Sequence, residues 1–589
     1  MLQDQDLLSI QEVRTKVEAA WQAAQRLSQL SQDQIDAIVE AMAAAAREHA
    51  VTLAEHAVTE TGYGNARDKT AKNMLAADLL PKAIRGLKTV GVIREIPEEK
   101  RVEIAVPVGV VAAIVPTTNP TSTAIYKSII ALKGANSIVI SPHPRARNCT
   151  CATAKILHDA AVRAGAPEGA IQCLTLATIE STNALMRHEK TAVILATGGS
   201  AMVRAAYSSG KPAFGVGPGN VPVLLDSSAD VAESVRKVVQ GKSFDYGTLC
   251  SSEQTMVAER SLREPILAEL RKQRAFLCDA EQTLRLGRTL LTPKLGVNPE
   301  YVGQAAPKLA KMAGFEVPPD TTILVAEIGG IGRDHPLSAE KLSPVLALYF
   351  VPDFAAGLDA CEAILRMGGL GHTCVIHARD EARIRAYGLR MPAFRVLVNT
   401  PAPQGSTGIT TTLQPAMTLG CGAIAGNSTG DNVGPLHLVH VKRMAAAVRE
   451  ASPGAVSSSA GMAEPIDRNQ LLSAVERYVA ARGVSLSGGG TSVASSVVDR
   501  FLASRAGAVS APVEVPTAPM PQVPTVQAPI DIAPFVCEDD VRQAMRREQK
   551  IHIGPRTILT PSARDLGAQY DILVMTDRPI GGKPKSNTE

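Results

Sequence analysis

The chain has 589 residues, 45% of them hydrophobic but only 3% aromatic, and at about 150 residues per domain this predicts three or four domains with aliphatic cores. Its 61 basic and 57 acidic residues leave a net charge of +4, which gives no reason to expect nucleic acid or an anionic membrane as a partner. Nine cysteines without a C-x-x-C pair predict reduced thiols in a cytosolic protein rather than a disulfide framework.

The N-terminal region, residues 10–60, predicts helices. A second helix begins after Ser31 and has Asp33 in its first turn. No apolar run reaches the roughly 18 residues of a membrane-spanning helix, and the acidic start does not resemble a secretory signal, so we expect a cytoplasmic protein without a membrane partner. Apolar residues recur at helical spacing in the first helix at Val13, Val17, Ala20, Trp21, Ala24 and Leu27.

Residues 94–106 predict a β-hairpin with one wet face, since the larger apolar residues Val102, Ile104 and Val106 stand at every second position after a charged turn. From Val108 onward, short continuous apolar runs alternate with helical stretches, which indicates βαβ units and an α/β fold with parallel sheets. The runs are 108–115, 137–140, 192–195, 221–225, 255–258, 322–325, 345–351, 374–377 and 395–399. We expect two lobes, 1–235 and 236–425, followed by a short segment 426–450.

Residues 451–589 predict a C-terminal extension of different composition. A Ser- and Gly-rich linker, 452–461, precedes an amphipathic helix at 466–482, and a Pro-rich linker follows at 509–535. Beyond it, 539–549 predicts a helix, and 551–554 and 558–559 predict short strands. The apolar face of the amphipathic helix consists of Leu471, Leu472, Val475, Tyr478 and Val479.

One cysteine, Cys250, lies in a loop of small and polar residues with Gly247, directly before the run 255–258. A thiol at the mouth of a strand can be exposed and reactive, whereas free cysteine is more often a buried small hydrophobe. Taken alone, the loop favours the buried alternative, and only the other motifs of the chain make Cys250 a candidate nucleophile.

Polar turns follow two predicted strands, where open α/β sheets bind ligands. Asn119, near Thr117, follows 108–115, and its amide can donate to an oxygen that becomes negative during attack on a carbonyl. An ordinary Asn-Pro turn is the alternative. Ser141, Pro142 and His143 end the next strand, where a ribose or an adenine edge fits, unless this is only a Pro-rich loop.

Glycines mark two further turns. Gly198 and Gly199 precede Ser200, a natural N-cap for a helix from Ala201. Free backbone amides at a helix start suit a pyrophosphate. An ordinary capped helix without a ligand is the alternative. Around Gly217, the run 215–219 is no G-x-G-x-x-G fingerprint, because a strand follows it. Close approach of its backbone to a substrate or thiol explains these glycines better.

Glu340 precedes the run 345–351, and a lone Glu is usually a solvated surface charge. The histidines, such as His372 and His377, lack the spacing of metal ligands, so we expect no metal.

The order of these motifs along residues 10–445 resembles that of the aldehyde dehydrogenase superfamily. The motifs are Asn119, Gly198–Ser200, the Gly217 turn, the Cys250 loop and Glu340-x-x-x-Pro344. The runs 214–220 and 369–373 narrow the resemblance to its CoA-acylating branch, which includes propionaldehyde and acetaldehyde dehydrogenases of bacterial microcompartments. The resemblance implies two Rossmann-like lobes, an NAD- and CoA-binding lobe at 1–235 and a catalytic lobe at 236–425. The first lobe would carry an oligomerisation hairpin near 94–106, and residues 426–450 would return to that lobe.

The site residues follow from the same resemblance. Cys250 would be the nucleophile and Asn119 its oxyanion donor, and NAD and coenzyme A would be the cofactors. Residues Thr117, Ser141, Pro142, His143, Gly198, Gly199, Ser200, Gly217 and Glu340 would bind them. Hydrolytic members carry a glutamate where this chain has Gly215, so the thioester on Cys250 would wait for a thiol, which needs little activation.

The implied reaction oxidises a short-chain aldehyde, propionaldehyde or acetaldehyde, to its acyl-CoA. A hydrolytic aldehyde dehydrogenase, a semialdehyde phosphate reductase and a shell-binding scaffold with an inactive dehydrogenase lobe remain alternatives. By resemblance, the enzyme would be a homodimer or homotetramer in the lumen of a bacterial microcompartment. The helix at 466–482 would bind shell proteins or else pack on its own enzyme. The run 554–565 also resembles stretches of microcompartment-associated proteins.

Overall fold

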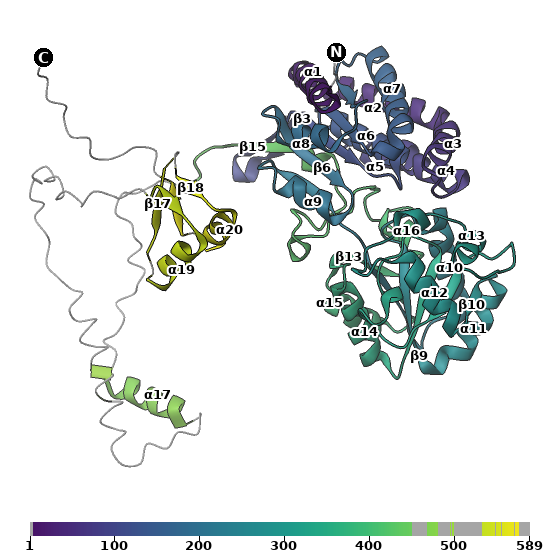
Figure 1. Cartoon of the computed structure of the whole chain (residues 1–589). Coiled ribbons are helices and arrows are strands. Elements are labelled where there is room, and N and C mark those ends of the chain that lie inside the picture. Colours follow the sequence, from purple (N-terminus) through teal and green to yellow (C-terminus); the bar gives the residue numbers. More distant parts are fainter. Residues whose placement is uncertain are drawn as a thin grey trace, which may run out of the picture. The chain divides into compact units, whose positions relative to one another are not determined.

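The computed structural model describes residues 4–449, 468–480, 495, 498–499, 533–547, 549–554, 557–570 and 572–575. They belong to two compact units, Met1–Ala451 and Ser452–Glu589, here called the main unit and the C-terminal unit. The predicted linker 452–461 and the Pro-rich linker up to residue 532 lie outside the described residues. Figure 1 shows the main unit as two α/β lobes that follow one another along the chain.

Five helices precede the first strand: α1 (Gln5–Leu27), α2 (Gln32–Glu48), α3 (Ala50–Thr61), α4 (Ala66–Met74) and α5 (Leu80–Ile84). The predicted stripe of α1 is confirmed, except that Trp21 is 38% exposed and carries the Lys190 ammonium 4.1 Å above its ring. Ser31 begins α2 with a capping box that Gln34 completes. A π-helical turn, Leu75–Leu79, joins α4 to α5.

The first lobe contains a parallel five-stranded sheet in the order β5-β4-β3-β6-β7. Alternate residues of β3 pack on opposite layers: Val111 and Ala113 lie in the cluster with α2, α6 and α7, and Val110 and Ala112 lie with α1, α8 and α9. The strands are β3 (Val110–Val115), β4 (Ser137–Pro142), β5 (Ile171–Cys173), β6 (Thr191–Thr197) and β7 (Ala213–Val216). The helices are α6 (Pro120–Lys133), α7 (Arg147–Arg163), α8 (Ile179–Arg187) and α9 (Ser200–Tyr207).

The second lobe contains a parallel seven-stranded sheet in the order β10-β11-β12-β9-β8-β13-β14. Its strands are β8 (Val221–Leu225), β9 (Glu253–Glu259), β10 (Phe276–Cys278), β11 (Leu324–Glu327), β12 (Val345–Val351), β13 (Gly371–His377) and β14 (Ala393–Val398). The sequence assigned the run 221–225 to the first lobe, but β8 pairs with β9 and β13. A buried apolar run carries no information about which parallel sheet it joins.

Helices cover both faces of this second sheet. Leu348 packs in the cluster with α10 and α11, and its neighbour Ala347 packs in the cluster with α12 and α13. The helices are α10 (Val231–Ser243), α11 (Arg263–Lys272), α12 (Ala280–Leu290), α13 (Ala306–Met312), α14 (Phe354–Arg366), α15 (Glu381–Arg390) and α16 (Ala402–Ser406).

A three-stranded antiparallel sheet confirms the predicted hairpin. β1 (Gly91–Ile96) and β2 (Arg101–Pro107) form the hairpin, and β15 (Val439–Ala445) pairs with β2. The segment after the second lobe therefore returns to the hairpin, as predicted for residues 426–450.

In the C-terminal unit, α17 (Arg468–Ala480) confirms the predicted helix at 466–482 over these residues. The described residues between 533 and 575 form two successive strand-helix-strand segments around a small core that includes Val536, Val541 and Ile553. The strands pair across the two segments, β16 with β18 and β17 with β19, in parallel. The elements are β16 (Phe535–Val536), α19 (Glu538–Arg546), β17 (Ile551–Ile553), β18 (Ile558–Leu559), α20 (Pro561–Gln569) and β19 (Leu573–Met575).

Within the described ranges, no helix combines the length and the apolar character needed to cross a membrane. The same part of the chain contains no group of three His, Cys, Asp or Glu side chains arranged to hold a metal ion.

Candidate active site

The candidate site lies where opposite edges of the two large sheets supply residues. Asn119 follows β3 and Gly198 follows β6, so both come from the carboxyl edge of the five-stranded sheet. Cys250 precedes β9, Glu340 precedes β12 and His372 is the second residue of β13, so these come from the amino edge of the seven-stranded sheet. The edges meet because Lys72 bonds both Asn119 and Thr248, two residues before the cysteine.

Cys250 is half-buried in the turn between the short segment Phe244–Gly247, whose two central residues have left-handed backbones, and β9. Burial raises the pKa of its thiol to about 12, and the nearby Glu340 and Cys421 add to the rise. The backbone approaches closely here, since a Cβ at Gly219 would lie 2.1 Å from the carbonyl oxygen of Cys250. The glycine-rich turn therefore packs against the cysteine, as the sequence predicted.

His372 is the partner of the thiol, and the sequence did not identify it. Its Nε2 lies 3.2 Å from Cys250 Sγ, and its Nδ1 lies 3.0 Å from Thr373 Oγ1. Burial lowers the pKa of the imidazole well below 6.5, and Arg395 lowers it further, so the ring is neutral at pH 7. A neutral imidazole can accept a hydrogen bond from the thiol. Because its pKa lies well below that of the thiol, it can take the proton only as the sulfur bonds to a carbonyl carbon.

Asn119 immediately precedes α6, whose N-terminus its side chain does not cap. Its Nδ2 donates to Thr118 Oγ1 over 3.1 Å, and its Oδ1 accepts from Lys72 Nζ. Both Asn119 and Thr117 are less than one-tenth exposed. The amide retains a second N–H for an oxygen in the site.

Glu340 is not a solvated surface charge. Its Oε1 accepts from the Gly219 N–H over 3.1 Å, and burial raises its pKa to about 7. The carboxyl group thus lies beside the turn that packs on Cys250.

The predicted phosphate-binding turn is confirmed as the start of a helix, but one detail was wrong. The N-cap is Gly199 and Ser200 is the first helical residue, so the Ser200 hydroxyl makes no cap hydrogen bond. Gly199 and Ser200 are exposed. A cavity of about 490 Å³ begins here and also touches Gly217, two arginines and Cys421.

The three predicted adenosine-binding residues at the end of β4 lie in different surroundings. Ser141 is buried, and its hydroxyl lies 2.8 Å from Thr182 Oγ1. Pro142 is also buried, whereas His143 is exposed and accepts a hydrogen bond from the Arg145 N–H at Nδ1. The structure does not bring these three residues together with Cys250, and their contact with an adenosine remains a prediction.

Gly215 occupies a position where a side chain has no room. A Cβ there would lie 2.7 Å from Val203 Cγ1 and 2.8 Å from the Tyr207 ring, and the Gly215 N–H donates to the Tyr207 hydroxyl. The sequence treated this residue as part of a loop, but it belongs to β7. A glutamate at 215 would require Tyr207 to move.

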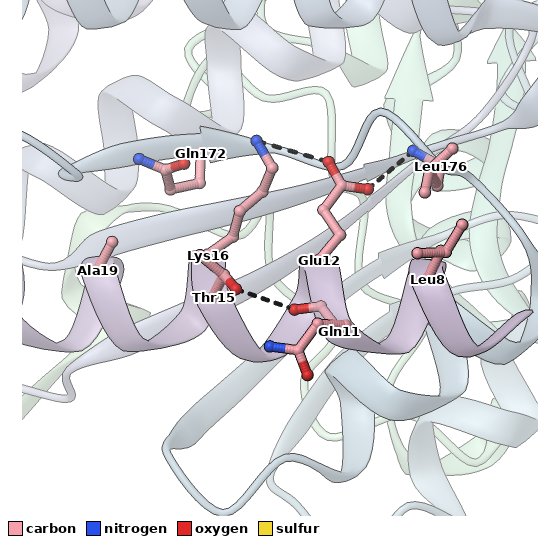
Figure 2. A pocket seen from close by; sticks show the side chains of 8 residues that line it. All are labelled: Leu8, Gln11, Glu12, Thr15, Lys16, Ala19, Gln172 and Leu176. Atoms are coloured by element: carbon pink, nitrogen blue, oxygen red, sulfur yellow. Dashed lines mark hydrogen bonds and ion pairs between the residues drawn. The ribbon is translucent and has the colours of Figure 1, made fainter. Parts of the chain in front are cut away.

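A second cavity of about 450 Å³ lies between α1 and the edge strand β5, apart from all predicted site residues. Figure 2 shows that Glu12 and Lys16 project into it from α1. The Glu12 carboxylate already accepts from the N–H groups of Thr175 and Leu176, so its oxygens are occupied within the chain.

Two α/β lobes that meet at a cysteine, an asparagine amide and a glutamate define the aldehyde dehydrogenase class of proteins. The chain belongs to the aldehyde dehydrogenase family, whose family model matches residues 4–286. It is 41% identical over 442 residues to the bifunctional aldehyde-alcohol dehydrogenase AdhE of Escherichia coli K12. The aligned residues make up 74% of this chain and 50% of that protein. The chain thus spans about half the length of the first curated relatives that it matches.

A shorter relative matches over nearly its whole length. The succinate-semialdehyde dehydrogenase (acetylating) of Clostridium kluyveri is 35% identical, over 73% of this chain and 95% of that protein. Among solved structures, an acetylating aldehyde dehydrogenase from Geobacillus thermoglucosidasius is 49% identical with a TM-score of 0.76, over 77% of this chain and all of that one. A propionaldehyde dehydrogenase from Rhodopseudomonas palustris with bound propionyl-CoA is 28% identical with a TM-score of 0.68, over 74% and 94% of the two chains. Two of these matches are named as acetylating, and a third is described with a bound acyl-CoA.

Proposed function

We propose that this protein oxidises a short-chain aldehyde to its acyl-CoA thioester, with NAD as hydride acceptor, through an acyl group carried on Cys250. The observation that carries the proposal is the thiol of Cys250 against the neutral ring of His372. The absence of a carboxylate at position 215, where Tyr207 and Val203 fill the space, supports an acceptor other than water. The names of the acetylating relatives agree with a thiol acceptor.

The cavity at the start of α9 fits a diphosphate cofactor. It combines the free amides of a helix N-terminus with the guanidinium groups of Arg204 and Arg366. Its far end touches Gly217 and Cys421, and Cys421 lies close enough to Cys250 to raise the pKa of that thiol. NAD and coenzyme A both carry an adenosine diphosphate, so the same residues would hold each in turn: Gly199 and Ser200 at the phosphates, and Glu340 nearer the thiol.

The chain's own residues account for the bond and proton changes. Cys250 Sγ bonds to the carbonyl carbon while His372 Nε2 takes the thiol proton, and the Asn119 amide donates to the oxygen that becomes negative. When bound, NAD supplies a hydride acceptor and coenzyme A supplies the second thiol. Loss of hydride from the tetrahedral carbon leaves a thioester on Cys250. After releasing its proton to solvent, His372 takes the proton of the second thiol, and Cys250 leaves as a thiolate.

The acceptor is tested by measuring NADH formation from propionaldehyde and from acetaldehyde, with and without coenzyme A or phosphate. We expect one NADH per site without an acceptor and sustained turnover to acyl-CoA with coenzyme A. Sustained turnover to the free acid without coenzyme A would establish a hydrolytic dehydrogenase, and turnover only with phosphate a semialdehyde phosphate reductase. The same assay with NADP in place of NAD decides the cofactor. A series of C2 to C5 aldehydes decides the substrate, because one methylene group changes the discrimination between two aldehydes by only about 1–3 kcal/mol.

We further propose that the protein acts as a homo-oligomer inside a bacterial microcompartment. The support is α17, whose sequence predicts one apolar face, together with the resemblance of 466–482 to cargo-targeting helices. Deletion of residues 464–482 should leave the turnover of the purified enzyme intact and abolish its co-purification with microcompartment shells. Retained co-purification would instead favour a helix that packs on its own enzyme, and co-purification of an intact protein that has no turnover would favour the scaffold alternative.

A further inference from the structure

A buried ammonium group joins the candidate oxyanion donor to the loop of the nucleophile. Lys72, on α4, is 1% exposed. Its Nζ donates to Asn119 Oδ1 over 2.5 Å, to Thr248 Oγ1 over 3.3 Å and to Asp245 Oδ2. An ammonium has three N–H donors and no acceptor, so this side chain is fully used.

These contacts determine which way the Asn119 amide faces. Because Lys72 can only donate, the atom toward it must be the amide oxygen, and the NH₂ group must point the other way. One N–H of this group donates to Thr118 Oγ1, and the Asn119 side chain makes no cap hydrogen bond to α6. The remaining N–H is the one that an oxyanion would receive.

Lys72 also fixes the loop that carries the cysteine. Asp245 is fully buried, and its Oδ2 accepts from Lys72, from Lys69 over 3.0 Å and from Thr248 Oγ1 over 2.6 Å. Asp245 and Tyr246 both have left-handed backbones, with φ of 47° and 53°. Such conformations persist only where the surroundings hold them. Here the surroundings are the two lysines of α4 and the Asn65 N–H, which donates to Asp245 Oδ1 over 2.8 Å.

We propose that Lys72 is a positioning residue of the reaction: its charge orients and polarises the Asn119 amide and ties it to the Cys250 loop. The inference rests on the proposed function, since it assigns Asn119 to the oxyanion of that reaction. A positive charge on the amide oxygen draws electron density from the NH₂ group, which strengthens it as a donor to a negative oxygen. The benefit grows as negative charge develops, so it belongs to the transition state rather than to aldehyde binding.

Lys69 provides a matched control. It lies on the same helix, is 2% exposed and bonds the same Asp245 oxygen, but its other partner is the Thr118 carbonyl rather than the Asn119 side chain. If Lys72 only stabilised the fold, replacement of either lysine should have the same effect on catalysis.

The test uses the full chain and five variants: Lys72→Met, Lys72→Gln, Lys69→Met, Asn119→Ala and the double variant Lys72→Met/Asn119→Ala. The measurement is the rate of the first NADH turnover with saturating NAD and varied aldehyde, without coenzyme A. We expect Lys72→Met to lower the saturated rate about 100-fold, comparable to loss of an oxyanion donor, with little change in the aldehyde concentration at half-saturation. Lys72→Gln keeps a neutral donor and should lose less, and Lys69→Met should lose least.

The double variant separates positioning from general damage. If Lys72 acts through Asn119, Lys72→Met should have almost no further effect once Asn119 is alanine. A full second loss in that background, or equal losses for Lys69→Met and Lys72→Met, would overturn the inference. If Lys72→Met does not fold, Lys72→Gln in the two backgrounds gives the same comparison. The proposed function fails separately, if the unmodified protein forms no acyl-CoA when coenzyme A is added to this assay.

Discussion

Replacement of Cys250 by alanine is expected to abolish aldehyde-dependent NADH formation, by roughly 10⁴-fold or more. The loss should be this large because the thiol forms the bond that converts the aldehyde into a tetrahedral hydride donor. The serine after it, Ser251, cannot replace it, because it is fully buried and bonded to Ser406 Oγ. The first-turnover assay measures the loss directly, because even a single NADH per site requires the thiol.

Cys421 is the matched control for this prediction. It is a second thiol beside the site, 2% exposed, with its Sγ directed at the Leu419 carbonyl. Cys421→Ala should retain most of the first-turnover rate, and mass spectrometry of enzyme treated with aldehyde and NAD should find the acyl group on Cys250 alone. An active Cys250→Ala variant, or an acyl group on Cys421, would contradict the assignment of the nucleophile.

The fold followed from the sequence wherever a run was long and apolar. β8 and β12 have the predicted bounds, and the hairpin at 94–106 is confirmed. The strands that the sequence did not indicate are β5, β7 and β10, with three or four residues each, too short for any periodicity to show. The same limit explains why β16 and β19 in the C-terminal unit were missed. The helix α20 between β18 and β19 was missed as well.

The site was predicted only as far as local patterns reach. Asn119 and Gly199 follow strands of the first sheet, where the rule that ligands bind at carboxyl ends applies. In the second lobe the rule points to the wrong edge, because Cys250, Glu340 and His372 lie at the amino ends of their strands. Cys250 and Glu340 came instead from the order of motifs, which resembles that of a known family.

The missed residues act across long sequence separations. His372 lies 122 residues after the thiol it contacts, and Lys72 lies 47 residues before Asn119. Neither residue has a local signal, since a histidine in an apolar strand and a lysine in a helix look ordinary. The sequence did contain a hint in the run Gly369–Thr373. At Gly371 a Cβ would lie 1.8 Å from the Cys421 carbonyl oxygen, so the strand that carries His372 is packed tightly against the site.

Replacement of His372 by alanine is expected to slow NADH formation by about 10²- to 10⁴-fold, the usual contribution of a positioned base. The pH dependence should also change. Burial holds the pKa of the imidazole well below 6.5, so the base of the unmodified enzyme is neutral at pH 6.5 and above. Protonation of His372 should therefore cause no loss of rate when the pH is lowered from 8 to 6.5. Without it, the thiolate must form by loss of the proton to solvent.

Because the pKa of the Cys250 thiol is raised to about 12, the thiolate fraction in His372→Ala is small throughout the neutral range. Below that pKa the fraction increases about tenfold with each pH unit, so the first-turnover rate of the variant should rise steeply from pH 6.5 to 8. Above pH 8 the rise should weaken, because burial lowers the pKa of Lys72 to about 8 and its charge on Asn119 is then lost. His377→Gln, on the same strand but with no contact to the thiol, is the control and should keep the pH profile of the unmodified enzyme. A rate in the variant that is already flat between pH 6.5 and 8 would mean that the thiol is acidified by its surroundings and does not depend on His372. The ring would then serve to orient Cys250, and a group other than His372 would have to accept the proton of the second thiol.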